Sequence, residues 1–250
     1  MAMRCAVFAS GGGSNFQALL DRKAMGDLHV DFVLMIGNNS KAAAFERARS
    51  NNIPTLHIAP SHFDDEEKYA QTMMDALTKA RTELIVLAGY MKKLPSSIVK
   101  EYRNRIVNIH PGLLPAFGGK GMYGINVHKA VLEYGAKVSG VTVHFVDEEY
   151  DHGPVITQAA VPVLDSDDAQ TLAERVLIAE HGTYWRALEA IAMEQISVDG
   201  RKVVNVHKVI ESHTALEETL RLKILAAAAD AVKNKGSIPE SAVRDVSQIS

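Results

Sequence analysis

The stretch Asn108-Ile109-His110-Pro111-Gly112-Leu113-Leu114-Pro115 indicates both the type of fold and the place of a functional site. It follows Arg105-Ile106-Val107, a short β-branched run that predicts a buried strand ending at Asn108. Because side chains alternate along a strand, Asn108 and His110 are expected on the same side. Polar side chains at the end of a strand lie where α/β folds bind ligands. An amide can donate to an oxyanion and an imidazole can carry a proton, but a turn-forming Asn and a surface His explain the pattern equally well.

Strand-length apolar runs alternate with helical patterns on both sides of this stretch, which predicts an α/β protein. The run at residues 84–88 has no polar residue, as is typical of a central parallel strand. Strands are expected at residues 4–10, 31–36, 55–58, 84–88, 105–108, 139–146 and 155–163, helices at 15–23, 40–51, 64–81, 95–102, 126–134, 168–192 and 214–233, and a hairpin at 196–204.

The composition is that of an ordinary globular protein of 250 residues, with 47% hydrophobic and 23% charged residues. The net charge of −3 gives no electrostatic argument for binding nucleic acid or an anionic membrane. The only cysteine, Cys5, lies in an apolar run and is expected to pack in the core. A single thiol excludes an internal disulfide and cysteine-based zinc motifs. With neither a signal peptide nor a spanning segment in the sequence, we expect a cytoplasmic protein.

A glycine-rich turn, Gly11-Gly12-Gly13-Ser14-Asn15, joins the first strand to the first helix. Free backbone N–H groups and the helix dipole make such a turn an anion site, although a tight turn with an ordinary Ser or Asn cap has the same pattern. A P-loop would need Gly-Lys-Ser/Thr, which is absent. The second strand closes on residues 37–40 without the acid that would bind a ribose in a dinucleotide fold. A phosphate of mononucleotide size therefore fits better.

Two further loops complete the candidate site. The acidic loop at residues 147–154 contains Asp151, which could raise the pKa of His110 and fix its tautomer. A solvated acidic turn is the more common reason for such a loop. Residues 116–124 hold four glycines, so this loop is expected to be either mobile or closely packed against a neighbour.

Taken together, these motifs resemble those of the phosphoribosylglycinamide formyltransferases, which are folate-dependent enzymes of purine biosynthesis. The resemblance covers about the first 200 residues and implies an open, mostly parallel twisted sheet with helices on both faces. The region beyond about His207, with the helix expected at 214–233, exceeds the usual catalytic domain and is expected to be a C-terminal helical extension. The motifs are Ser10-Gly11-Gly12-Gly13-Ser14-Asn15, Leu87-Ala88-Gly89-Tyr90-Met91, Asn108 to Pro115, Val143-His144-Phe145-Val146 and Asp151-His152-Gly153-Pro154.

The resemblance implies that 10-formyltetrahydrofolate, as co-substrate, gives its formyl group to the amine of glycinamide ribonucleotide, without a metal. It implies small-molecule partners and allows a homodimer. The domains would be 1–205, divided into a ribonucleotide half (1–105) and a catalytic and folate half (106–205), and an extension at 206–250. The implied site residues are Asn108, His110 and Asp151 for catalysis, Gly12, Gly13, Ser14, Asn15 and Glu180 for the substrate, and Met91, Lys92, Lys93, Leu94, Val146, Asp147 and Asp151 for the folate.

Three other functions stay open at this point. A formyltetrahydrofolate hydrolase would use the same three catalytic side chains but give the formyl group to water. A metallohydrolase would need spaced ligands such as His-Glu-x-x-His, which none of the ten histidines forms. A non-catalytic mononucleotide-binding module would leave Asn108, His110 and Asp151 without use.

Overall fold

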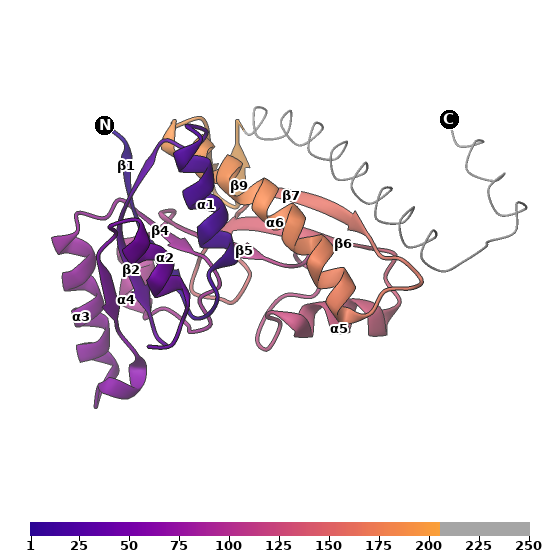
Figure 1. Cartoon of the computed structure of the whole chain (residues 1–250), viewed down its shortest axis with the longest axis horizontal. Coiled ribbons are helices and arrows are strands. Elements are labelled where there is room, and N and C mark those ends of the chain that lie inside the picture. The colour runs from indigo at the N-terminus through magenta and orange to yellow at the C-terminus, as the bar shows by residue number, and fades with distance from the viewer. Residues whose placement is uncertain (206–250) are drawn as a thin grey trace, which may run out of the picture. The chain divides into compact units, whose positions relative to one another are not determined.

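The computed structural model describes residues 1–205 of the chain (Figure 1). The expected helix at 214–233 lies outside the described residues. Strands and helices alternate through most of the described part, as the sequence predicts. The strands are β1 (Met3–Ala9), β2 (Val30–Gly37), β3 (Thr55–His57), β4 (Leu84–Leu87), β5 (Ile106–His110), β6 (Val138–Phe145), β7 (Val155–Pro162), β8 (Ser197–Asp199) and β9 (Lys202–Val204). The helices are α1 (Ser14–Ala24), α2 (Ala44–Ser50), α3 (Glu66–Lys79), α4 (Ser96–Glu101), α5 (Ile125–Tyr134) and α6 (Ala169–Ala192), with a 3₁₀ turn at Pro60–His62.

Seven strands form one sheet in the order β3-β2-β1-β4-β5-β6-β7. The first five in this order pair in parallel, whereas β6 pairs antiparallel to both β5 and β7. The predicted open, mostly parallel sheet is therefore confirmed. The carboxyl-terminal ends of β1, β4 and β5 lie at the same end of the sheet because these strands are parallel. The neighbouring strand β6 is antiparallel to β5 and places His144 directly opposite Asn108.

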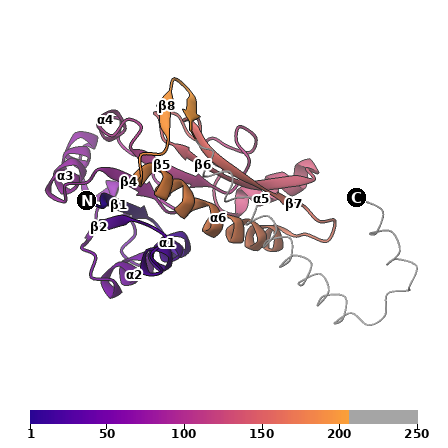
Figure 2. The ribbon, with the colours of Figure 1, turned by 90° about the horizontal axis from the view of Figure 1, so that it is seen from above.

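Helices cover both faces of the sheet, as Figure 2 shows: α3 and α4 lie on one face, and α1, α2 and α6 on the other. Alternate residues of β1 serve the two faces, since Ala6 and Phe8 pack in the core beneath α3 and α4. On the opposite face Tyr184 of α6 is 1% exposed, and its hydroxyl donates to the carbonyls of Leu87 and Val107 at 2.9 and 3.1 Å. Tyr184 thus ties α6 to β4 and β5 beside the site.

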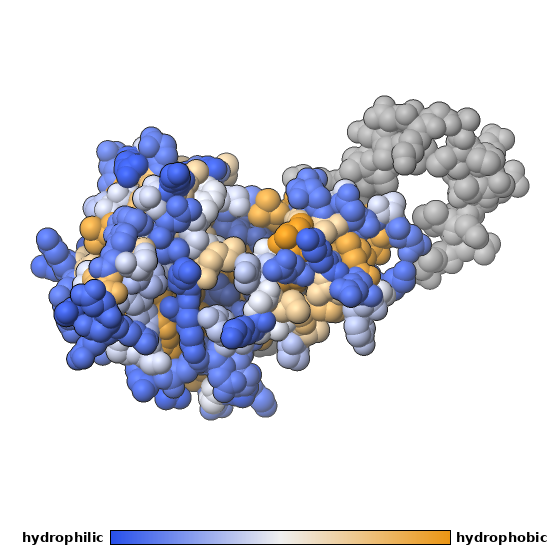
Figure 3. Space-filling view, turned by 90° about the horizontal axis from the view of Figure 1, so that it is seen from below, coloured by the Kyte–Doolittle hydropathy of each residue, from blue (hydrophilic) through white to orange (hydrophobic). Residues whose placement is uncertain are grey.

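The apolar residues of the strands and helices form a buried core in the described part of the chain. Cys5 is fully buried in β1, where burial raises the pKa of its thiol to about 12. Hydrophilic side chains cover most of the face seen in Figure 3, with hydrophobic patches between them. In the described part of the chain, no helix is both long and apolar enough to cross a membrane.

Two helix starts show how local hydrogen bonds set the element bounds. The sequence predicts a helix from Ser40, but α2 begins at Ala44 because Asn39 closes a turn first: its Oδ1 accepts the N–H of Lys41 at 3.1 Å. Asp168, which precedes the first residue of α6, accepts the N–H groups of residues 170 and 171 in a capping box. The boundary between the domain at 1–205 and the extension at 206–250 stays a prediction. The division of the domain into halves at 1–105 and 106–205 stays a prediction too.

Candidate active site

The glycine-rich turn places the start of α1 in the wall of a cavity of about 480 Å³. Gly13 has a φ of 70°, and a Cβ there would lie 2.8 Å from the Cβ of Ala44, so both the backbone conformation and the nearby α2 require glycine. Ser14 and Asn15, in the first turn of α1, line the cavity. The predicted residues Gly12 and Gly13 shape this turn but are not part of the wall.

Glu180 of α6 reaches the same turn. Its Oε2 accepts a hydrogen bond from Asn15 Nδ2 at 2.7 Å, and the residue is only 7% exposed. Burial raises the pKa of this carboxyl to about 7, although the bond from Asn15 opposes the rise. The amide oxygen of Asn15 is buried too and has no partner among the described residues. The two side chains therefore offer oxygen acceptors to a ligand that carries hydroxyl donors.

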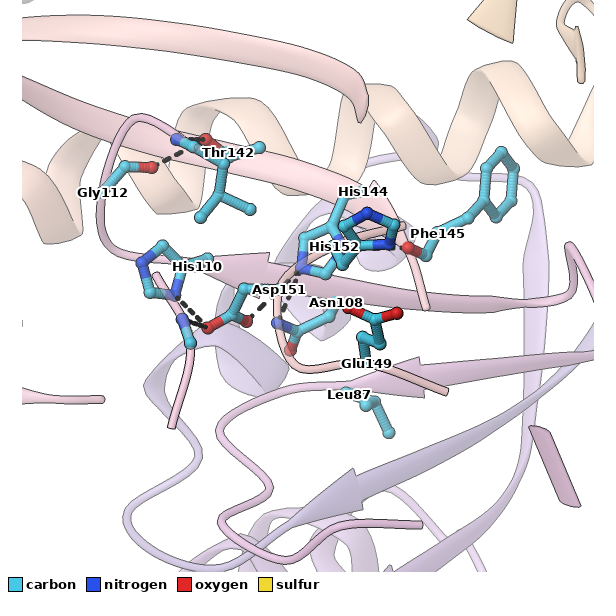
Figure 4. A network of polar contacts seen from close by, with 12 residues as sticks. Leu87, Asn108, His110, Gly112, Thr142, His144, Phe145, Glu149, Asp151 and His152 are labelled. Atoms are coloured by element: carbon cyan, nitrogen blue, oxygen red, sulfur yellow. Dashed lines mark hydrogen bonds and ion pairs between the residues drawn. The ribbon is translucent and has the colours of Figure 1, made fainter. Parts of the chain in front are cut away.

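Asn108 and His110 of β5 and Asp151 of the loop between β6 and β7, predicted from two distant segments, come together at the carboxyl-terminal end of β5 (Figure 4). The carboxylate of Asp151 lies between two imidazoles: Oδ2 is 3.6 Å from His110 Nδ1, and Oδ1 is 3.8 Å from His144 Nε2. These distances allow attraction between charges but exceed those of direct hydrogen bonds. All four side chains line the cavity.

Backbone carbonyls fix the proton positions of both imidazoles, since a carbonyl can only accept. His110 Nε2 donates to the carbonyl of Phe117 at 2.9 Å, so in the neutral ring Nδ1 is the unprotonated nitrogen that faces Asp151. His144 Nδ1 donates to the carbonyl of Phe145 at 2.8 Å, which leaves Nε2 to accept from Asn108 Nδ2 at 3.1 Å. This bond uses one N–H of the Asn108 amide and leaves the second free for a ligand.

Burial dominates the protonation of both rings. It lowers the pKa of His110 below its usual value, while the charge of Asp151 and the bond to Phe117 act in the opposite direction. The expected effect of Asp151 on His110 thus has the predicted sign but is smaller than that of burial. Burial also lowers the pKa of His144, against the same carboxylate. In the free protein the two rings therefore favour the neutral form near pH 7.

The residues expected to hold the folate all line this cavity. Their two loops meet across it, and the ammonium of Lys93 lies 5.5 Å from the centre of the Tyr150 ring. The first loop is tied to β1, because the backbone N–H of Met91 donates to Ser10 Oγ at 2.8 Å. The lining residues from these loops are Met91, Lys92, Lys93, Leu94, Val146, Asp147, Glu149, Tyr150 and Asp151.

The four-glycine loop is packed closely against the site at one end, through Gly118 and Gly119. A Cβ on Gly118 would lie 2.4 Å from Leu114 Cδ2 and 3.2 Å from Asp151 Cβ. The N–H of Gly119 donates to Asp151 Oδ2 at 2.9 Å. The run of glycines signalled close contact, but only the fold reveals that the neighbour is Asp151.

Sequence reasoning did not assign a role to His144. Alternation along its strand places it on one face with Thr142, but its position opposite Asn108 depends on the antiparallel pairing of β5 with β6.

The described residues contain no candidate metal cluster: within residues 1–205, no three His, Cys, Asp or Glu side chains are placed to hold an ion.

Comparisons with known proteins identify the family of the chain. The family model described as formyl transferase matches residues 3–188. A chloroplastic phosphoribosylglycinamide formyltransferase of Arabidopsis thaliana is 45% identical over 194 residues, which are 77% of this chain and 66% of the relative. The chain thus spans about two thirds of that plant protein.

Two solved structures share the fold. Glycinamide ribonucleotide transformylase 1 of Symbiobacterium toebii has a TM-score of 0.76 and 37% identity, with 81% of this chain and 93% of that chain covered. A formyltetrahydrofolate deformylase of Pseudomonas syringae has a TM-score of 0.73 and 27% identity, with 82% and 66% covered. The chain therefore belongs to the formyl transferase family and, within it, to the phosphoribosylglycinamide formyltransferases.

Proposed function

We propose that this protein transfers a formyl group from 10-formyltetrahydrofolate to the amine of glycinamide ribonucleotide, a step of purine biosynthesis. The observation that carries the proposal is one cavity whose wall contains three kinds of group. Ser14, Asn15 and Glu180 offer a helix N-terminus and oxygen acceptors that suit the phosphate and ribose of a nucleotide. The loops at 91–94 and 146–151 suit a flat, partly apolar ligand such as a pterin, and Asn108, His110 and Asp151 lie in the same wall.

The chemistry begins with attack of the neutral amine on the formyl carbon, which turns the formyl oxygen into an oxyanion. The free N–H of Asn108 would donate to this oxygen, and His144 would hold the amide in position through its bond at 3.1 Å. His110, once protonated at Nδ1, would supply a second stabilising donor. The proton that the attacking amine loses would pass through this ring to the folate nitrogen as the bond between that nitrogen and the formyl carbon breaks. Because burial keeps its ring neutral in the free protein, His110 would gain a proton only when the negative charge of the oxyanion joins that of Asp151.

The remaining predictions belong to this proposal. Gly12 and Gly13 would support the phosphate through the backbone of the turn, and 10-formyltetrahydrofolate would bind as a co-substrate without a metal. A cytoplasmic location, supported by the single buried thiol of Cys5, is checked by cell fractionation. Homodimer formation stays a prediction, for which sedimentation at several protein concentrations is the test.

Steady-state kinetics with the purified full-length chain test the function. Deformylation of 10-formyltetrahydrofolate is followed by absorbance, with and without glycinamide ribonucleotide. The proposal predicts a reaction that requires the ribonucleotide and forms one formylated product for each folate released. Equal rates with and without the ribonucleotide, together with free formate, would instead establish the second candidate, hydrolysis, which the similarity to the deformylase favours.

A further inference from the structure

The loop that carries Asp151 is attached to the small hairpin formed by β8 and β9. Arg201, in the turn of this hairpin, donates from Nη2 to the backbone carbonyl of His152 at 2.7 Å. Its Nη1 lies 2.8 Å from Nε2 of the same histidine. One guanidinium therefore holds both the backbone and the side chain of the residue that follows Asp151.

The imidazole of His152 extends this contact into the loop. Its Nδ1 lies 2.8 Å from Oδ2 of Asp147 and donates to this carboxylate. Nη1 of Arg201 is 2.8 Å from Nε2 and 3.1 Å from Nδ1, so the guanidinium lies against the imidazole ring. The other oxygen of Asp147 accepts the backbone N–H of Glu149 at 2.9 Å. A continuous chain of hydrogen bonds thus runs from the hairpin through His152 to the middle of the loop, and Figure 4 draws His152 and Glu149 near Asp151.

This chain of bonds bears on Asp151 because the backbone of that residue needs support. Asp151 has a φ of 54°, in the left-handed region that residues other than glycine rarely adopt. Gly153, two residues on, packs so closely that a Cβ would lie 1.9 Å from the carbonyl oxygen of Phe145. His152 lies between these two positions, so the hydrogen bond from Arg201 to its carbonyl and the contact of Arg201 with its ring fix the backbone that aims the Asp151 carboxylate.

We propose that Arg201 and His152 are positioning residues, which hold the carboxylate of Asp151 between the imidazoles of His110 and His144. Neither side chain lines the cavity, so they act through Asp151 and not by touching a substrate. The effect on turnover rests on the proposed function, whereas the placement of the carboxylate does not.

The first test measures the pKa of the His110 imidazole by NMR titration of the ligand-free, full-length protein. The ionisable groups that face His110 are Asp151 from the loop, His144 from β6 and His128 from α5. In Arg201→Ala the carboxylate moves away, and the pKa of His110 should fall because the charge that raises it is weakened.

A matched control separates this effect from general damage to the hairpin. Lys202, the next residue and the first of β9, is exposed and forms no side-chain hydrogen bond or ion pair with the described residues, so Lys202→Ala should titrate like the wild type. Arg201→Lys can still donate one hydrogen bond to His152 and should give an intermediate pKa for His110. If Arg201→Ala does not fold, His152→Ala removes the contacts of the imidazole with Asp147 and Arg201 and leaves only the bond from Arg201 to the backbone carbonyl.

The second readout is kinetic. In Arg201→Ala, kcat for formyl transfer should fall about tenfold, the scale for partners that orient a reacting group, while KM for the ribonucleotide stays unchanged. A wild-type titration of His110 in both Arg201→Ala and His152→Ala would overturn the proposal, whatever the activity. A wild-type protein that transfers no formyl group would contradict the proposed function alone, because the titration needs no substrate.

Discussion

Replacing Glu180 by glutamine should stabilise the ligand-free protein at alkaline pH and weaken the binding of the ribonucleotide. Burial raises the pKa of Glu180 from its ordinary value of 4.5 to about 7. At about 1.4 kcal/mol per pKa unit, this rise corresponds to about 3 kcal/mol of stability lost when the buried carboxyl ionises. A glutamine carries no charge and still has an oxygen that can accept from Asn15 Nδ2.

The pH range follows from the direction of the pKa change. Because the pKa of Glu180 is higher in the folded protein than in the unfolded chain, only the folded protein keeps this proton between 4.5 and about 7. The stability that Glu180 contributes is therefore fully present below 4.5 and is lost as the pH rises through about 7. The gain from Glu180→Gln should be small at about pH 5 and close to 3 kcal/mol at about pH 8.

Urea unfolding of the wild type and of Glu180→Gln at about pH 5 and about pH 8 measures the change. Glu174→Gln is the matched control, since Glu174 is exposed on the same helix and the same substitution there should leave the free energy of unfolding almost unchanged at both values of pH. Calorimetry should show weaker binding of glycinamide ribonucleotide to Glu180→Gln, because a carboxylate accepts from hydroxyl groups more strongly than an amide does. An equal stability change at both pH values would refute the argument from burial.

Three other substitutions test the catalytic residues and the strands that hold them. Asn108→Ala should lower kcat about 100- to 1000-fold at saturating substrates, the usual loss for one oxyanion donor; full turnover would exclude that role. Asp151→Asn should lower the pKa of His110, since the charge that raises it disappears, and an NMR titration identical to that of the wild type would contradict this. Tyr184→Phe should lower the free energy of unfolding in urea by about 1–3 kcal/mol, because the buried carbonyls of Leu87 and Val107 lose their donor. A change within the error of the fit would show that water replaces the hydroxyl.

Local patterns were sufficient to predict most elements of the fold. The unbroken apolar run of β4 reflects burial on both faces of the sheet, which a sequence displays directly. The start of α2 could not be predicted in the same way, because the Asx turn at Asn39 competes with a helix at the same residues. β5 also continues through His110, beyond its expected end at Asn108, because β6 pairs with it as far as that residue.

Some residues of the candidate site could likewise be recognised from local patterns, whereas others depend on contacts between distant segments. Asn108, His110 and the glycine-rich turn were recognisable because each follows a strand and carries polar or glycine residues where a ligand would lie. The role of His144 and the tie from Arg201 to His152 depend on strand pairing and on a hairpin nearly fifty positions away. The net pKa of His110 was equally inaccessible, since it depends on how completely the folded protein buries the ring.

Isotope tracing tests the central claim most directly, namely that one carbon passes from the folate to the amine beside Asn108 and His110. The enzyme is given 10-formyltetrahydrofolate labelled with ¹³C in the formyl group, together with glycinamide ribonucleotide, in water enriched in ¹⁸O. Direct transfer predicts a formylated ribonucleotide that contains ¹³C and no ¹⁸O. Labelled formate that carries ¹⁸O, formed in place of this product, would contradict the account.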